Sequence, residues 1–126
     1  GDRFVFQSEV LFGSGSAKIG GAGETQLTQL ATTLRDISKK IPAKINWVLR
    51  VDGHTDRIPI RTPKYSSNWE LSSARAISVV KFLTAQGIPA ERLAATGFGE
   101  HQPLDAREDE IAFRRNRRIE LKLTQR

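Results

Sequence analysis

The sequence contains no cysteine, no methionine and no hydrophobic run long enough to cross a membrane. The missing cysteines exclude disulfides and thiolate chemistry. The missing methionine means that no native start residue is present. We therefore expect the 126 residues to form a single domain taken from a longer protein. Any anchor or export signal would then lie outside this domain.

Negative charge is also scarce, because 20 lysines and arginines outnumber 14 acidic residues and give a net charge of +6. Such a balance suits nucleic acid, anionic lipid or another acidic polymer. The segment FRRNRRIELK gathers four arginines, a density typical of a phosphate-binding patch: Arg114, Arg115, Arg117 and Arg118. Only Phe113 is interleaved with them, and no DNA- or RNA-binding module fits the order of elements. We predict no nucleic-acid partner, with arginines that are solvated or support loops.

Hydrophobic periodicity predicts four strands and three helices. Alternation predicts strands at 3–12, 44–53, 92–99 and 117–123. Spacings of three and four predict helices over 27–41, which Pro42 ends, over 71–86, which Gly87 ends, and over 105–116. Ser67 and Glu70 have the spacing of a capping box before the second helix. The order β-α-β-α-β-α-β predicts an α+β sandwich with helices packed on a mixed four-stranded sheet.

The segment VDGHTDRIPI places Asp52, His54 and Asp56 at alternate positions. Side chains at alternate positions of a strand share a face, so these three could converge on a metal. Gly53 is expected to end the strand, however, and no second cluster of ligands completes a coordination shell. We predict no metal and no cofactor. His54 is expected to be a strand-end residue that hydrogen-bonds to the loop backbone.

The Gly-rich segment at 13–17, GSGSA, lies between a predicted strand and a predicted helix, where a phosphate-binding loop would lie. It lacks the lysine and the spacing of a P-loop, and it lacks the G-x-G-x-x-G pattern. We interpret it as a flexible turn.

Two opposite charges flank the same predicted strand-to-helix connection. Asp56 lies at the strand end, and Arg75 lies in the first two turns of the next helix. Helical side chains lean toward the helix N-terminus, so Arg75 would tilt toward the rim that holds Asp56. A carboxylate and a guanidinium facing one gap would hold a zwitterion. From spacing alone, a structural salt bridge between the two residues is the simpler reading.

Four motifs occur in order along the chain: GHTD, NWELSSARA, GIPAERLAATGFGE and NRRIEL. Together with VLFGSGSAKI near the start, they resemble the OmpA-like peptidoglycan-binding domain shared by OmpA C-terminal domains, Pal lipoproteins and the flagellar stator protein MotB. The resemblance covers nearly the whole chain, and SNWELS is most similar to MotB-like members. It implies a non-enzymatic module that binds the cell wall.

The resemblance also implies roles for individual residues. Asp56 and Arg75 would grip the meso-diaminopimelate of a peptidoglycan stem peptide. The other expected ligand-binding residues are Thr55, Asn68, Trp69 and Leu71, the last two through helix-start amides, and Arg117 rather than Arg118 of the NRR motif. The loop at 57–67 is a few residues longer than in OmpA or Pal, so it could cover the ligand or contact glycan.

The resemblance further implies a parent protein that is anchored in the inner or outer membrane and reaches peptidoglycan in the periplasm. Two alternatives remain open. One is a stator-like or scaffold component that uses wall binding for force transmission, which would allow a homodimer. The other is a wall hydrolase that uses His54 with Asp52 or Asp56.

Overall fold

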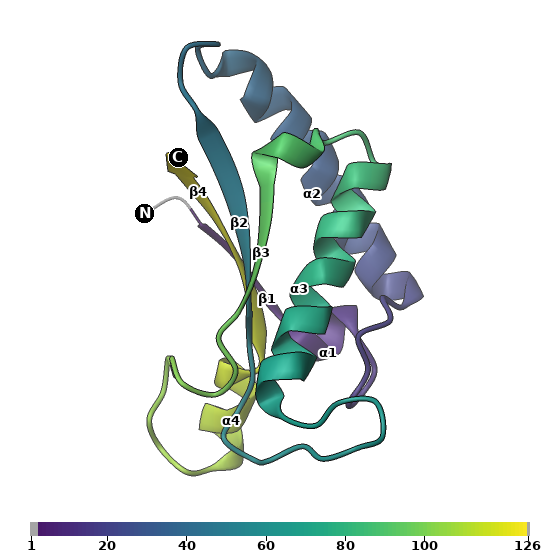
Figure 1. Ribbon diagram of the computed structural model, residues 1–126, viewed down its shortest axis with the longest axis vertical. Coiled ribbons are helices and arrows are strands. Elements are labelled where there is room, and N and C mark those ends of the chain that lie inside the picture. The colour runs from purple at the N-terminus through teal and green to yellow at the C-terminus, as the bar shows by residue number, and fades with distance from the viewer. Residues whose placement is uncertain (1–2, 126) are drawn as a thin grey trace.

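The computed structural model describes residues 3–125 and consists of helices packed on one four-stranded sheet (Figure 1). The elements are β1 (Arg3–Gln7), α1 (Ser8–Leu11), α2 (Gly21–Lys40), β2 (Trp47–His54), α3 (Asn68–Ala85), the short 3₁₀ helix η1 (Ala90–Arg92), β3 (Leu93–Gly97), α4 (Glu110–Asn116) and β4 (Arg118–Gln125). None of the helices in this part of the chain has the length and apolar character needed to span a bilayer.

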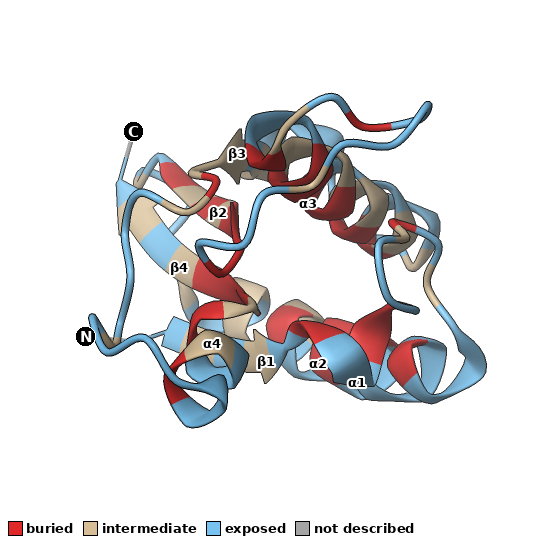
Figure 2. Ribbon diagram, turned by 90° about the horizontal axis from the view of Figure 1, so that it is seen from below, coloured by how far each residue is buried: buried red, intermediate tan, exposed pale blue. Residues whose placement is uncertain are grey.

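The sheet is mixed and has the strand order β1-β4-β2-β3. β4 pairs antiparallel with β1 and with β2, and β2 pairs parallel with β3. Helices α2 and α3 lie against the same face of this sheet (Figure 1). The apolar stripes of both helices and of the strands meet there, and Figure 2 shows the buried residues on these facing sides. The predicted α+β class and mixed four-stranded sheet are confirmed.

The first predicted strand, 3–12, is too long. β1 ends at Gln7, and a single helical turn, α1, follows. The Ser8 amide donates a hydrogen bond to the carbonyl of Arg117, and the Phe12 amide donates one to the carbonyl of Ser8. This turn buries Leu11 and leaves Val10 41% exposed, although strand alternation would place Val10 on the same face as the buried Ser8 and Phe12. Long-range pairing with the start of β4 therefore overrides the local strand pattern.

Other predicted boundaries also differ from the structure. The helix predicted from residue 27 already begins at Gly21, and β2 begins at Trp47 rather than at residue 44. β2 does not end at Gly53, because Gly53 pairs with both Gly97 and Ile119 and the strand continues to His54. The third predicted helix is shortened to Glu110–Asn116. Asp109 caps it by accepting from the Ala112 amide, so residues 105–109 stay outside the helix.

Glycine lets α3 approach the sheet closely at the C-terminal ends of β2 and β3. A Cβ on Gly53 would lie 2.2 Å from the carbonyl oxygen of Ser72, and one on Gly97 would lie 2.0 Å from the Ser73 hydroxyl. Both glycines therefore permit a contact that any side chain would block. This contact fixes the first turns of α3 beside the C-terminal end of β2.

Both ends of α3 have the capping residues predicted from the sequence, but one hydrogen bond at its start differs from the predicted one. Ser67 is the N-cap, as predicted, but its hydroxyl oxygen accepts from the Trp69 amide rather than from the Glu70 amide. The Ser67 hydroxyl in turn donates to the Glu70 carboxylate. At the other end, Gly87 has a φ of 97°, which confirms the predicted left-handed stop.

Candidate functional site

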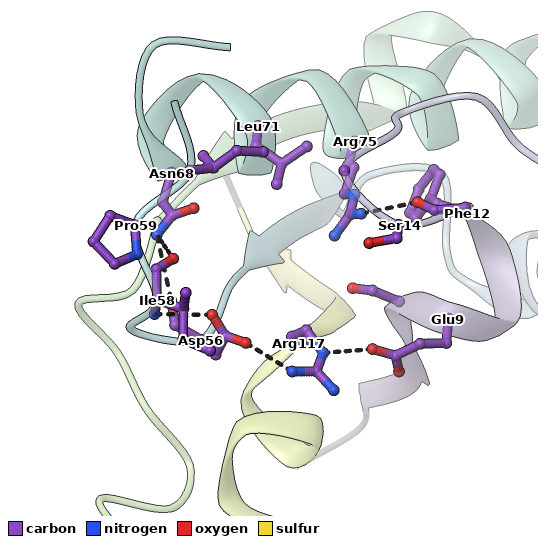
Figure 3. A pocket seen from close by; sticks show the side chains of 14 residues that line it. Glu9, Phe12, Ser14, Asp56, Ile58, Pro59, Asn68, Leu71, Arg75 and Arg117 are labelled. Carbon is purple, nitrogen blue, oxygen red and sulfur yellow. Dashed lines mark hydrogen bonds and ion pairs between the residues drawn. The ribbon is translucent and has the colours of Figure 1, made fainter. Parts of the chain in front are cut away.

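A cleft of about 470 Å³ opens where α1, the 13–15 loop, the 58–60 loop and the start of α3 meet (Figure 3). Its charged lining consists of Glu9, Asp56, Arg75 and Arg117. The close approach of α3 to β2 brings Asp56, which follows β2, and Arg75, on α3, to the walls of this one cleft. The sequence-based expectation that these two residues share a gap therefore agrees with the geometry.

Arg75 is a buried cation, 5% exposed, held by backbone carbonyls. Its Nε donates to the carbonyl of Ser16 at 2.8 Å and its Nη2 to that of Gly13 at 3.3 Å. The guanidinium also lies 5.1 Å from the centre of the Phe12 ring. Among residues 3–125 it forms no ion pair with a carboxylate. Burial lowers the pKa of Arg75, as expected for a charged group withdrawn from water without a full counter-charge.

Asp56 does not pair with Arg75. Its Oδ1 accepts from the Ile58 amide at 3.0 Å, and its Oδ2 forms an ion pair with Nη1 of Arg117 at 2.7 Å. A structural salt bridge between Asp56 and Arg75, the simpler reading from spacing, is therefore wrong. A carboxylate has about four acceptor positions, so Asp56 retains capacity for a further donor.

Arg117 connects three carboxylates, of which Asp56 and Glu9 line the cleft. Besides Asp56 it contacts Glu9 on α1 at 2.5 Å and Glu110 on α4 at 3.0 Å. Burial lowers its pKa, but the hydrogen bonds to these three carboxylates outweigh burial and raise the pKa overall. Arg117 is thus a permanent cation that orients acidic groups at the cleft.

The other predicted residues divide into those that line the cleft and those that support it. Asn68 and Leu71 line it. Asn68 also donates through Nδ2 to the carbonyl of Ile58 at 3.1 Å and to Glu100 at 3.2 Å, which fixes the neighbouring loops. The buried Thr55 does not line the cleft, and its hydroxyl donates to the Asp56 carbonyl.

Trp69 is also absent from the cleft lining. Its side chain is 51% exposed and stacks on His101 with 4.7 Å between ring centres. The helix-start amides that we expected to face a ligand are already engaged, since the amides of Trp69 and Leu71 donate to the side chain and the carbonyl of Ser67.

Sequence reasoning missed several lining residues. Glu9 was hidden inside a predicted strand. The GSGSA segment is a wall of the cleft rather than only a turn, since it presents the carbonyls that hold Arg75. Ile58, Pro59 and Ile60 of the long 57–67 loop form the opposite rim. The one available signal was the length of that loop beside Asp56.

Comparison with known proteins identifies the fold family. The sequence profile of the OmpA family matches residues 11–117. The chain belongs to the OmpA family. The match spans the cleft residues from Phe12 to Arg117, whereas Ser8 and Glu9 on α1 lie just before it.

Three similar proteins illustrate the relationship. The protein YtxE of Bacillus subtilis is 37% identical over 118 residues, covering 93% of this chain but 46% of its own length. A MotB-like protein of Desulfovibrio vulgaris superposes with a TM-score of 0.85 at 28% identity, covering 98% of this chain and 73% of that one. The cell wall anchor of the T6SS from Pseudomonas aeruginosa gives 0.83 at 32% identity, covering 98% and 80%. This OmpA-family chain thus spans less than half the length of the Bacillus relative.

The sheet face away from α2 and α3 carries Asp52 and His54 of the OmpA-family domain. Asp52 pairs there with Arg50, whereas Asp56 lies in the cleft, so Asp52, His54 and Asp56 do not converge. Within the described residues, no cluster of three His, Cys, Asp or Glu side chains suits a metal. This placement also separates His54 from Asp56, one of the two dyads considered for hydrolysis.

His54 itself departs from the expectation of a hydrogen bond to the loop backbone. Its ring stacks on Phe98 at 5.0 Å, and its buried Nδ1 has no hydrogen-bond partner among residues 3–125. Burial, followed by the positive charge of Arg118, lowers the pKa of His54 to about 4. The carboxylate that faces its Nε2, at 4.0 Å, belongs to Glu120.

The arginines in and around the NRR motif lie in different parts of the folded OmpA-family domain. Arg117 faces the cleft, while Arg118 is 3% exposed and pairs with Glu120 on the other side of the sheet. Arg115 pairs with Asp105. The run of positive charge in the sequence therefore does not form one phosphate-binding patch.

Proposed function

We propose that this chain is a non-enzymatic module that binds peptidoglycan through the meso-diaminopimelate of the stem peptide. The observation that carries the proposal is Arg75, a buried guanidinium that backbone carbonyls hold without an ion-paired carboxylate in the described chain, across a cleft from Asp56. A buried cation of this kind gains most from a ligand that supplies the missing anion. The anchor of the T6SS, similar in sequence and fold, supports a role at the cell wall.

The free end of meso-diaminopimelate presents an ammonium and a carboxylate on one carbon. Arg75 would take the carboxylate in bidentate fashion, and Asp56 would take the ammonium. Asn68, Leu71 and Arg117 would shape the cleft around this end group. Thr55 would hold the Asp56 backbone, and Trp69 would act through the α3 start that it helps to build. Each charge-assisted hydrogen bond contributes about 1.5–3 kcal/mol.

The direct test is a titration of the domain with a diaminopimelate muropeptide. We expect Asp56→Asn and Arg75→Lys to weaken binding by about tenfold or more, since each loses one charge-assisted contact or its fork geometry. Arg114→Ala is the matched control, because it removes an exposed arginine that forms no ion pair within residues 3–125. Unchanged affinity of both cleft variants would refute the site.

The ligand offers a second control that leaves the protein unaltered. Amidation of the diaminopimelate carboxylate removes the anion that Arg75 would bind, and replacement of diaminopimelate by lysine removes it as well. Both ligands should bind the wild-type domain more weakly. Equal affinity for all three peptides would exclude recognition of this carboxylate.

A stator-like or scaffold component is the second candidate, and the MotB-like structural neighbour favours it. In this case the same cleft would transmit force between a membrane-anchored parent and the wall in the periplasm, and the parent would act as a homodimer. Light scattering on the complete parent protein tests the dimer. A monomeric parent would contradict the stator-like role and leave simple tethering to the wall as the proposed function.

A further inference from the structure

The acidic side of the cleft carries a second carboxylate, Glu9, in addition to Asp56. Asp56 is ion-paired at 2.7 Å with Arg117, a cation at every physiological pH. The formal charges of this pair cancel. An ammonium group that met only Asp56 and Arg117 would therefore find little net attraction.

Glu9 supplies the charge that this pair lacks. Its Oε1 accepts from Nε of Arg117 at 2.5 Å, so both carboxylates are held by one guanidinium and lie on one side of the cleft (Figure 3). Its Oε2 accepts no hydrogen bond from the residues that the structure describes. Glu110 also contacts Arg117, but its side chain is 65% exposed and does not line the cleft.

Glu9 also acts on the far wall of the cleft. Burial is the largest influence on the pKa of Arg75 and lowers it. Among the acidic groups that oppose this effect, Glu9 ranks ahead of Asp56. Glu9 is therefore electrostatically coupled to the guanidinium that would receive the ligand carboxylate.

We propose that Glu9 and Asp56, held by Arg117, form a two-carboxylate wall that binds the ammonium of the ligand opposite Arg75. The inference rests on the proposed function and adds a specificity-determining residue to it. The wall carries two negative charges against one positive charge, so it keeps a net charge of −1 toward an ammonium. Arg117 is a positioning residue in this arrangement.

The test combines one substitution with one ligand change. Glu9→Gln keeps an oxygen that accepts from Arg117 but removes the charge, and we expect it to weaken muropeptide binding about threefold to tenfold. Glu110→Gln is the matched comparison, because it makes the same chemical change at the other exposed partner of Arg117. We expect it to weaken binding by less than about twofold. With a muropeptide whose diaminopimelate ammonium is acetylated, Glu9→Gln should bind as well as the wild type.

The outcomes separate the two proposals. A Glu9→Gln penalty that persists with the acetylated ligand, or that Glu110→Gln reproduces in full, would show an indirect structural effect and overturn the two-carboxylate wall. Binding that depends on Asp56 and Arg75 but not on Glu9 would overturn this inference alone. Absence of any binding by the wild-type domain would overturn the proposed function and the inference together.

Discussion

Arg75 and His54 are ionisable side chains that are buried without a complete set of partners among residues 3–125. Arg75 faces a cleft, where a ligand can supply what the protein does not. His54 is packed against Phe98 on the open sheet face, next to the buried Arg118–Glu120 pair. Its imidazole is therefore neutral at pH 7, because protonation would add a second buried cation beside Arg118. The first residue is suited to binding, and the second makes the fold sensitive to acid.

This environment predicts a specific pH dependence of stability. The pKa of His54 is about 4 in the folded domain and about 6.5 when unfolded, so the unfolded chain binds the proton more tightly. The stabilisation is present above pH 6.5 and is lost as the pH falls toward 4. We expect the free energy of unfolding to fall by about 1–2 kcal/mol between pH 7 and pH 5 from this residue.

Urea unfolding of the wild type and of His54→Gln at several pH values measures the effect. The range from pH 7 to pH 5 keeps the acidic side chains largely ionised, so the difference between the two proteins reports on position 54. Glu120 opposes the shift of the His54 pKa, while Arg118, Lys122 and Arg50 reinforce it. Parallel stability profiles for the two proteins would contradict this account.

Among the elements, α3 positions most of the cleft, and glycines set its position. Gly53 on β2 and Gly97 on β3 are paired neighbours, and both touch the second turn of α3. The approach brings Asn68 and Arg75 over the C-terminal end of β2, where Asp56 follows. The Asn116 side-chain amide forms hydrogen bonds with the backbone of residues 104–105 and so fixes the connection before α4.

Gly53→Ala should therefore be strongly destabilising. The added methyl group would overlap the Ser72 carbonyl, and relieving the overlap requires α3 to move, at a cost of about 3 kcal/mol. Thermal unfolding and muropeptide titration should both show the loss. Gly21→Ala is the control, since no atom beyond its chain neighbours and the nearby backbone of α2 lies within 4 Å of the position of its Cβ. We expect that change to be neutral or slightly stabilising, by up to about 1 kcal/mol. Equal stability of the two variants would disprove the role of close packing.

At the scale of the whole molecule, the sheet separates two chemically different regions. The helix-covered face ends in the cleft with its opposed charges (Figure 3). The open face carries Asp52 and His54. Of the two acid–histidine pairs that a hydrolase could combine, His54 and Asp56 are therefore separated, and Asp52, which shares the face with His54, is ion-paired with Arg50. The groups that a zwitterion would need are together. This division favours binding over cleavage.

We expect the domain to co-sediment with purified sacculi that contain diaminopimelate and to release no soluble fragments during incubation. Co-sedimentation should decrease for Arg75→Lys and remain for Arg114→Ala, because only the first alters the cleft. Chromatography of the supernatant measures release. Soluble muropeptides that appear with the wild type and disappear with His54→Ala would instead support the hydrolase.

The sequence by itself determined the order of the four strands and of the helices α2, α3 and α4, the cap at Ser67, the stop at Gly87 and the nearness of Asp56 to Arg75. These features depend on hydrophobic periodicity, on residues with strong local backbone preferences, and on one short connection between a strand and a helix. The family motifs added Arg117 over Arg118 as an expectation, and the fold places Arg117 at the cleft.

Only the tertiary structure decided which charges meet. The helical turn at α1, the position of Glu9, the pairing of Asp56 with Arg117 and the carbonyl contacts of Arg75 join segments that are 59 to 108 residues apart. Local sequence carries no information about such partners, because the energy of an ion pair depends on distance and burial after the chain has folded. The same sequence spacing would have allowed Asp56 and Arg75 to neutralise each other, and the packing of α1 and β4 prevents it by giving Asp56 a different arginine.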